Sequence, residues 1–319
     1  MRPPTPLLTV SCAPHVHSGL TTRAMMFETL MALIPAVIMA VVNYGLPAMR
    51  VLALAGAAAV AVEYLCTRIM EREIETDNLH GLLTGLLLAF LLPASAPWWL
   101  VLAGAAAAIV LGKAIFGGIG GSPLCAPCIG WAVLVLSWPE LMDTELTLLG
   151  FNFFAPLHQL KHFGALAVAD FPLAQALSGQ QIGGLGSTQV LPLLLGGLWL
   201  ALRGRIKPFI PLGFLAGVLL AAACFHFPAP EEYASPIFHL CAGSTVFAAF
   251  FLATDSSSSP AYPLPALLFG LFAGCLLVLI RVWGVYPDGA AFAVLLANLV
   301  APLLDRIRPE PFGHRKEAI

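Results

Sequence analysis

Long apolar runs dominate this chain and constrain its fold more than any other feature. Hydrophobic residues make up 59% of the 319 residues and charged residues 10%, so too few polar side chains remain to cover a water-soluble globule. Ten stretches approach or exceed the length that crosses the roughly 30 Å hydrocarbon core of a bilayer, and Gly and Pro shorten or interrupt some of them. They are residues 24–43, 48–68, 79–93, 97–115, 127–142, 189–203, 208–226, 236–254, 264–283 and 287–304. The sequence therefore predicts an all-α polytopic membrane protein.

The Lys and Arg residues in the loops and near the ends of the spans predict the orientation of the spans. With ten spans and a cytoplasmic N-terminus, Arg50, Lys161 and Arg281 fall on the outer side, and the other 12 of the 15 fall on the cytoplasmic side. Those 12 are Arg2, Arg23, Arg68, Arg72, Lys113, Arg203, Arg205, Lys207, Arg306, Arg308, Arg315 and Lys316. Both termini, 1–23 and 306–319, are therefore predicted to be cytoplasmic tails. In a bacterium the chain would lie in the inner membrane, with its outer face periplasmic.

The longest polar-to-mixed stretch, residues 143–188, separates five spans from five. An odd number of spans in each half places two copies of a duplicated unit in opposite orientations. We therefore expect two inverted five-helix repeats, at 24–142 and 189–305, joined by a periplasmic connecting segment. Internal similarity agrees, because Ala89–Ser95 resembles Ala249–Asp255 at an offset of 160 residues.

Two Gly/Pro-rich breaks precede the fifth and the tenth span, at 117–127 and 284–289. Broken helices expose unpaired backbone groups, and membrane proteins built from inverted repeats bind ligands at such points. These breaks are therefore one candidate site.

A second candidate is the run Gly183-Gly184-Leu185-Gly186-Ser187-Thr188, which leads directly into the apolar segment 190–202. The glycines permit a tight turn, and Ser187 and Thr188 stand where a helix should begin. Free backbone N–H groups and hydroxyls would then face one point, an arrangement that suits a phosphate. The alternative interpretation is an ordinary helix cap within a Gly-rich turn.

Four segments carry a family resemblance. They are Gly186-Ser187-Thr188 with Leu195-Gly196-Gly197-Leu198, then Lys113–Gly121, then Phe250–Asp255, and finally Tyr286–Asn298, whose Tyr-Pro-Asp-Gly start is the most specific piece. Together they resemble the RnfD/NqrB family of membrane subunits in redox-driven ion pumps, over roughly residues 20 to 308. The length of the chain favours the RnfD branch.

The resemblance implies ten spans in two inverted halves and an FMN joined through its phosphate to a threonine hydroxyl. By match to the motif this threonine is Thr188, near the periplasmic face, where a separate flavin transferase would attach the FMN. Ser187 and Gly186 would assist in binding. Asp288 is a further cofactor-binding candidate, because its turn lies on the same predicted face; capping of the tenth helix is the alternative. The resemblance leaves open a second, noncovalent flavin such as riboflavin near the cytoplasmic ends.

The function implied is that of a subunit in an Rnf-type complex, which exchanges electrons between ferredoxin and NAD while it moves Na⁺ or H⁺. This chain carries no nucleotide fold and no cysteine array for iron–sulfur clusters, so partner subunits with iron–sulfur and flavin centres would perform that chemistry. The chain would relay electrons and line the ion path, without being catalytic alone. No nucleic-acid partner and no metal site are predicted.

Two other functions stay open. A channel or facilitator for a small solute or ion also favours inverted repeats and broken helices. An assembly scaffold that has lost its cofactor would explain two departures from the family motif, at Leu185 and Ser187. Two further departures are Ser122–Cys128, in place of an Asn-Pro-rich run, and the four serines Ser256–Ser259.

Two pairs of titratable residues have more than one interpretation. Glu28 and Glu63 lie within or near apolar spans, where a carboxylate serves either ion movement or a salt bridge. Cys125 and Cys128 have the spacing of redox dithiols and of half of many metal sites.

Overall fold

Secondary structure is helical throughout the part of the chain that the computed structural model describes, apart from one isolated β-bridge between Phe154 and Gln181. The described residues are 21–71, 76–143, 153–168 and 171–307. The two predicted tails therefore lie almost entirely outside the described residues, as does the first part of the connecting segment.

The first half of the chain begins with two long helices, α1 (Thr22–Tyr44) and α2 (Leu46–Ile69). The hydroxyl of Thr21 accepts a hydrogen bond from the Ala24 amide and so caps α1. Three shorter apolar helices follow: α3 (His80–Leu91), α4 (Trp98–Ile109), which a π-helical turn at Val110–Ala114 extends, and α5 (Ala126–Ser137). A single turn, α6 (Pro139–Met142), ends this half.

Short helices occupy the connecting segment, α7 (Pro156–Phe163) and α8 (Leu173–Ser178), with a 3₁₀ turn at Ala165–Val168 between them. The second half contains α9 (Val190–Leu202), α10 (Phe209–His226) and α11 (Pro236–Cys241). It continues with α12 (Thr245–Phe247), which runs into a π-helical turn at Ala248–Leu252, and ends with α13 (Pro263–Trp283) and α14 (Ala290–Leu304).

Each predicted apolar span coincides with helix, but two of them are interrupted. The span predicted at 127–142 ends as α5 at Ser137, because Pro139 disfavours helical backbone at the residue before it, and Trp138 has φ −137°. The span predicted at 236–254 breaks between α11 and α12, where Gly243 has a positive φ of 64°. Both interruptions agree with the expectation that Gly and Pro interrupt some of the spans, although the sequence did not predict these two positions.

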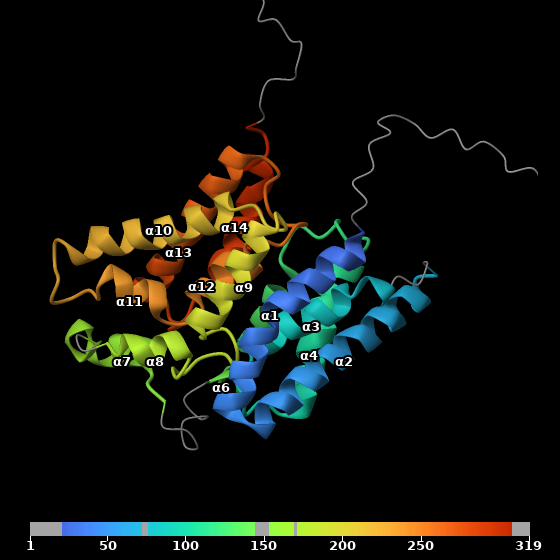
Figure 1. Cartoon of the computed structure of the whole chain (residues 1–319), viewed down its shortest axis with the longest axis horizontal. Helices are drawn as coiled ribbons and strands as arrows, with labels where there is room; N and C mark the ends of the chain where they lie inside the picture. The colour runs from blue at the N-terminus through green and yellow to red at the C-terminus, as the bar shows by residue number, and fades with distance from the viewer. Residues whose placement is uncertain (1–20, 72–75, 144–152, 169–170, 308–319) are drawn as a thin grey trace, which may run out of the picture.

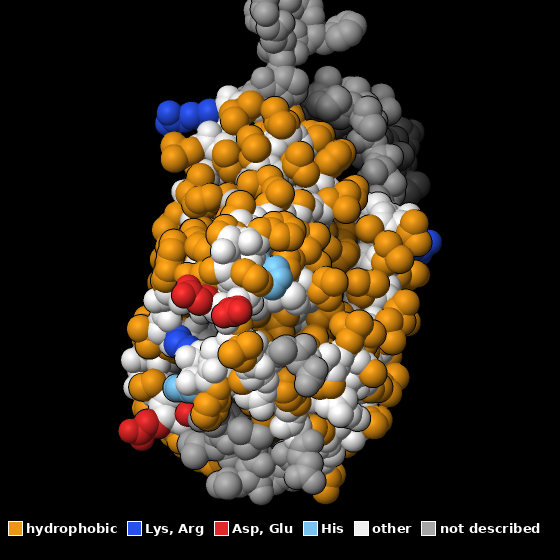
Figure 2. Space-filling view, turned by 90° about the vertical axis from the view of Figure 1, so that its left-hand side faces the viewer, with side chains coloured by type: hydrophobic (Ala, Val, Ile, Leu, Met, Phe, Trp, Pro, Cys, Tyr) orange, Lys and Arg blue, Asp and Glu red, His pale blue; other side chains and the backbone are white. Residues whose placement is uncertain are grey.

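The chain is a multi-pass membrane protein. Four helices, α1, α2, α10 and α13, are long and apolar enough to cross a membrane, and five shorter apolar helical segments accompany them. Large hydrophobic side chains point outward from these helices, as Ile38, Leu220 and Leu299 do, and lipid would cover them. Hydrophobic side chains likewise cover most of the face seen in Figure 2, with only scattered charged groups.

The two halves repeat a packing pattern. In the first half α2 packs against α3 and α4, and α4 against α5; in the second, α10 packs against α11 and α13, and α13 against α14. Figure 1 shows α1–α4 on one side, α10, α11 and α13 on the other, and α9, α12 and α14 between them. The first helix of one half, α1, packs against the first of the other, α9. This correspondence agrees with a duplicated core and supports the inverted repeat, which stays a prediction.

Candidate functional site

A cavity of about 250 Å³ lies where the two halves meet. Its walls come from the ends of α3 and α5, from the Gly-rich loop before α9, from α7, and from the segments that precede α12 and α14. The lining residues are Leu91, Trp131, Val135, Pro139, Met142, Asp143, Leu157, His158, Ile182, Gly183, Gly184, Ser187, Ser244, Tyr286, Pro287, Asp288 and Ala291. The Gly-rich loop and the break before the tenth span therefore contribute to one cavity, whereas the break at 117–127 lines two other cavities, so the two breaks do not form one site.

Aromatic side chains brace one wall of this cavity. The rings of Trp131 on α5 and Phe292 on α14 meet edge to face with centroids 5.0 Å apart, and Tyr286 packs on Phe292 at 5.1 Å. Trp131 and Tyr286 both line the cavity. The α5–α14 contact thus presents two aromatic rings to whatever the cavity binds.

The Gly-rich loop is fixed to the end of α3 by its backbone. The amide of Leu185 donates to the Leu92 carbonyl at 2.8 Å, and the amides of Gly186 and Ser187 both donate to the Phe90 carbonyl, at 3.2 and 3.1 Å. A Cβ atom at Gly186 would lie 2.6 Å from the Phe90 ring, so this residue must be glycine to pack there. The expectation that these amides are free to bind a phosphate was wrong, because the carbonyls at the end of α3 use them.

Ser187 and Thr188 differ in where their hydroxyls lie. Ser187 is 2% exposed and lines the cavity. Thr188 is fully buried, and its hydroxyl donates to the carbonyls of Gln181 and Gly184 at the long distances of 3.4 and 3.5 Å. Neither residue caps α9, which begins at Val190 after Gln189 with no side-chain cap, so the ordinary-cap interpretation was also wrong.

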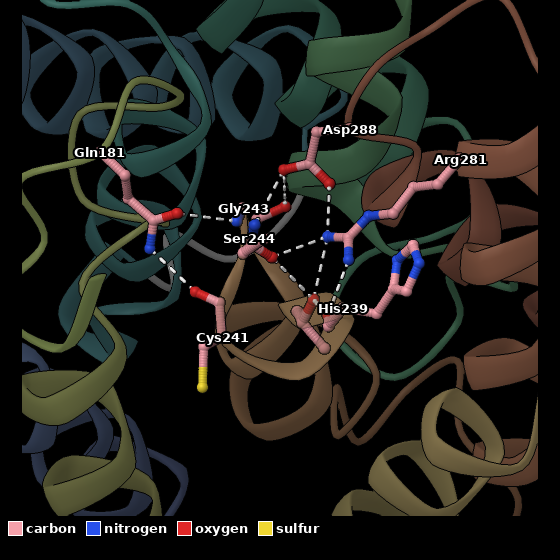
Figure 3. A network of polar contacts seen from close by, with 9 residues as sticks. Gln181, His239, Cys241, Gly243, Ser244, Arg281 and Asp288 are labelled. Atoms are coloured by element: carbon pink, nitrogen blue, oxygen red, sulfur yellow. Dashed lines mark hydrogen bonds and ion pairs between the residues drawn. The ribbon is translucent and has the colours of Figure 1, made fainter. Parts of the chain in front are cut away.

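Asp288 sits at the centre of a polar network that closes one side of the cavity (Figure 3). One carboxylate oxygen accepts hydrogen bonds from the Ser244 amide and hydroxyl, at 2.8 and 2.6 Å, and the other accepts from Arg281 at 3.2 Å. Asp288 therefore caps the start of α12, and the alternative that it caps the tenth helix was wrong, since Gly289 precedes α14 without a side-chain cap.

Arg281 and Gln181 hold the break between α11 and α12 in place. Arg281 is buried and donates to the carbonyls of His239 and Ala242 and to the Thr245 hydroxyl, at 2.7 to 2.9 Å. Gln181 donates to the carbonyls of Thr188 and Cys241, both at 2.9 Å, and accepts from the Gly243 amide at 3.1 Å. These side chains satisfy the backbone groups that a broken helix leaves unpaired. No sequence pattern predicted Gln181 or Ser244, whereas a buried arginine within an apolar run is a recognisable signal.

A lysine from the connecting segment fixes α7 beside the cavity. Lys161 donates to the carbonyl of Gly284 at 2.6 Å and to that of Val285. Burial lowers the pKa of its ammonium below the ordinary value. The contact ties α7, which carries the cavity residues Leu157 and His158, to the end of α13.

A second cavity, of about 130 Å³, lies at the opposite ends of α3 and α5, where His80 and Cys125 line it. Arg205 and Asp255 contribute charged groups to its wall. Burial raises the pKa of the Asp255 carboxyl, against the opposing effect of hydrogen bonds from the hydroxyls of Ser257 and Ser258.

Both acids that the sequence singled out in apolar spans are paired. Glu28 on α1 binds Arg205 at 2.8 Å and Arg203 at 3.3 Å, across the contact between α1 and α9. Glu63 on α2 forms a buried ion pair with Lys113, beside a third cavity of about 170 Å³. The salt-bridge interpretation is thus confirmed for each, and ion movement through either stays a prediction.

Comparison with known proteins gives one consistent family. The model of the NQR2, RnfD, RnfE family matches residues 9–313. The D subunit of the ion-translocating oxidoreductase complex from Yersinia pseudotuberculosis serotype O:1b (strain IP 31758) is 34% identical over 346 aligned positions, which cover 96% of this chain and 98% of the relative. Proteins of the same name from Cronobacter sakazakii (strain ATCC BAA-894) and Escherichia coli (strain SMS-3-5 / SECEC) are 34% and 32% identical, over 96% of this chain and 99% of each relative.

Proposed function

Since the chain belongs to the NQR2, RnfD, RnfE family, we propose that it is the RnfD-type membrane subunit of an Rnf-type complex in a bacterial inner membrane. Its relatives are named as subunits of an ion-translocating oxidoreductase complex, and they align with nearly all of this chain. The complex would couple electron transfer between ferredoxin and NAD to the movement of Na⁺ or H⁺. Partner subunits would hold the iron–sulfur clusters and bind the nucleotide, because those sites need residues that this chain lacks.

The chain's own part would be to relay electrons through FMN bound covalently to Thr188. The observation that carries this proposal is the cavity of about 250 Å³ beside the Gly-rich loop. Its lining fits a flavin ring, because most of its residues are apolar and include Trp131 and Tyr286. Its polar groups come from Asp143, His158, Ser187, Ser244 and Asp288. Bound there, FMN would accept and donate electrons one or two at a time. The surrounding helices would orient it and exclude water.

The attachment point has a physical rationale within the loop. The two hydrogen bonds of the Thr188 hydroxyl are long, so esterification of this oxygen would sacrifice little. Because the loop amides of Leu185 to Ser187 are occupied, the dipole of α9 would supply the favourable potential for the phosphate. Ser187 lines the cavity and is the competing hydroxyl. Thr188 is proposed on the motif match.

A second, noncovalent flavin such as riboflavin would bind at the cavity of about 130 Å³ at the other end of α3 and α5, where His80 and Arg205 would supply polar contacts. With the predicted orientation, the FMN would lie near the periplasmic face and this second site near the cytoplasm. Electrons crossing the protein would then pass from one cavity towards the other.

In-gel flavin fluorescence tests the attachment. The full chain is co-expressed with a flavin transferase, and the denatured polypeptide is examined for a fluorescent band. We expect the band in the wild type and in Ser187→Ala, and its loss in Thr188→Val, which keeps the shape of threonine but lacks the hydroxyl.

Two other outcomes would contradict this assignment. Loss of the band in Ser187→Ala with retention in Thr188→Val would move the ester to Ser187. A wild-type chain without flavin mass on the peptide that contains Thr188 would sink the covalent relay and favour a cofactor-free scaffold or channel.

A further inference from the structure

Two cysteines flank the first turn of α5. Cys125 is the residue before the helix, at its N-cap, and Cys128 lies one turn later. Their exposed fractions are 1% and 0%, and neither forms a disulfide. The two side chains are therefore separated by one turn of helix, in the Cys-X-X-Cys spacing that allows two cysteines to form a disulfide.

The pair also borders the second cavity, through Cys125. The opposite wall comes from the segment after the second π-helical turn, with Asp255 and Ser257. The hydroxyl of Ser122, just before the cysteines, donates to the Ser257 hydroxyl at 3.1 Å. Cys125 can thus be approached from the cavity, at the contact between the two halves, whereas Cys128 is covered.

We propose that Cys125 and Cys128 form a redox-active dithiol that converts reversibly to a disulfide by exchange with a small disulfide compound. The spacing of two residues at a helix N-terminus is one that active dithiols use. Cys125 attacks the small disulfide from the cavity, forms a mixed disulfide and releases one thiol. Cys128 then attacks the Cys125 sulfur and releases the second thiol. Two S–H bonds of the protein and the S–S bond of the small compound break. One S–S bond forms in the protein, and two S–H bonds form in the released thiols, which carry away the two electrons and two protons.

The surroundings of the pair shape how it reacts. The adjacent Cys128 thiol, burial and the nearby Asp255 carboxyl all raise the pKa of the Cys125 thiol well above its ordinary value. The reduced Cys125 thiol is therefore neutral at neutral pH, and the disulfide, which is neutral too, places no charge in the buried site. Since the thiolate is the attacking species, the rate of exchange rises as the pH is raised.

A redox titration of the purified full chain tests the proposal. The folded protein carries Cys224→Ser, which removes the exposed cysteine of the described residues, and Cys12→Ser, and is equilibrated with mixtures of reduced and oxidised glutathione. It is then quenched in acid, denatured, and alkylated. Mass spectrometry follows the peptide that contains Cys125 and Cys128. We expect both residues to lose alkylation together with a two-electron dependence on the glutathione ratio, and the peptide to become lighter by two hydrogen atoms.

Single substitutions test the order of attack. In Cys128→Ser the mixed disulfide between Cys125 and glutathione should accumulate, and in Cys125→Ser no adduct should form on Cys128. Cys66→Ser is the matched control and should titrate like its parent. If both cysteines of the folded chain stay fully alkylated at every ratio, while Cys224 of the wild type forms a glutathione adduct, the proposal is overturned. That comparison needs neither substitution at the pair, so a misfolded variant does not weaken it.

Discussion

Arg281 is buried within an apolar helix, and Asp288 is the acid that neutralises it. The side chain of Arg281 is 1% exposed and that of Asp288 is 26% exposed. Loss of the acid would therefore leave the charge of Arg281 in a site that is nearly free of water. Removing one partner of such a pair costs about 3–5 kcal/mol. Asp288 also caps α12 through Ser244, which adds a hydrogen-bonding contribution. Asp288 therefore stabilises the cavity wall, whatever it does for a ligand.

We expect Asp288→Ala to lower the free energy of unfolding by about 3–5 kcal/mol for this reason. Asp288→Asn should cost less, because its amide oxygen still accepts from the Ser244 amide. The measurement is the thermal unfolding midpoint of the purified chain in detergent, combined with in-gel flavin fluorescence. An Asp288→Ala variant that is as stable as the wild type but has lost its flavin would instead make Asp288 a direct ligand contact.

The candidate site illustrates which residues a sequence can identify. Ser187, Asp288 and the glycines were found because they stand in recognisable turns, and the cavity brings these turns together. Gln181 was not found, because its role depends on three backbone groups from distant segments that only the folded chain brings near. The loop amides were misjudged for the same reason, since their acceptors lie at the end of α3.

The break between α11 and α12 depends on one glycine. Gly243 has φ 64°, and a Cβ there would lie 2.6 Å from a Leu157 methyl and 2.9 Å from polar atoms of both Arg281 and Asp288. Gly45, between α1 and α2, has φ 66° with no atom within 4 Å of a Cβ. The two positions therefore share a positive φ and differ in their surroundings.

Alanine at each glycine separates these two effects. Gly45→Ala should cost about 1–3 kcal/mol of stability through the positive-φ backbone alone. Gly243→Ala should cost about 1–3 kcal/mol more, because the methyl group overpacks the Arg281–Asp288 contact. Unfolding midpoints in detergent measure both. Equal losses for the two variants would show that the region around Gly243 has room to adjust.

Helix ends were less predictable than helix positions. Each predicted apolar stretch coincides with helix, since burial in lipid forces backbone hydrogen bonds to close within each segment. Interruption of some stretches by Gly and Pro was expected. The positions at Trp138 and Gly243 were not predicted, because the flanking residues stay apolar and a run of apolar residues looks the same whether its helix is whole or broken. Pro139 and Gly243 are the local signals there, and both residue types also occur in continuous membrane helices.

At the scale of the whole molecule, orientation follows from loop charge and the number of crossings. Leu166 lies in the connecting segment and is 74% exposed, whereas Arg203 and Arg306 are exposed just after α9 and α14. One predicted span separates residue 166 from residue 203, and four separate residue 203 from residue 306. Positions 203 and 306 should therefore share the cytoplasmic side, with residue 166 opposite.

Single cysteines introduced at these three positions, in a chain with Cys12→Ser and Cys224→Ser, test this arrangement. A membrane-impermeant maleimide added to cells with a permeable outer membrane should label Leu166→Cys. It should label Arg203→Cys and Arg306→Cys only after the inner membrane is opened, which also shows that those two thiols are reactive. Labelling of positions 203 and 306 from opposite sides would require an odd number of crossings between them. That result would exclude four crossings between the two positions, and with them the five-span second half. The broken segment α11–α12 would be the segment that does not cross the membrane, and the second half would then have fewer spans than the first.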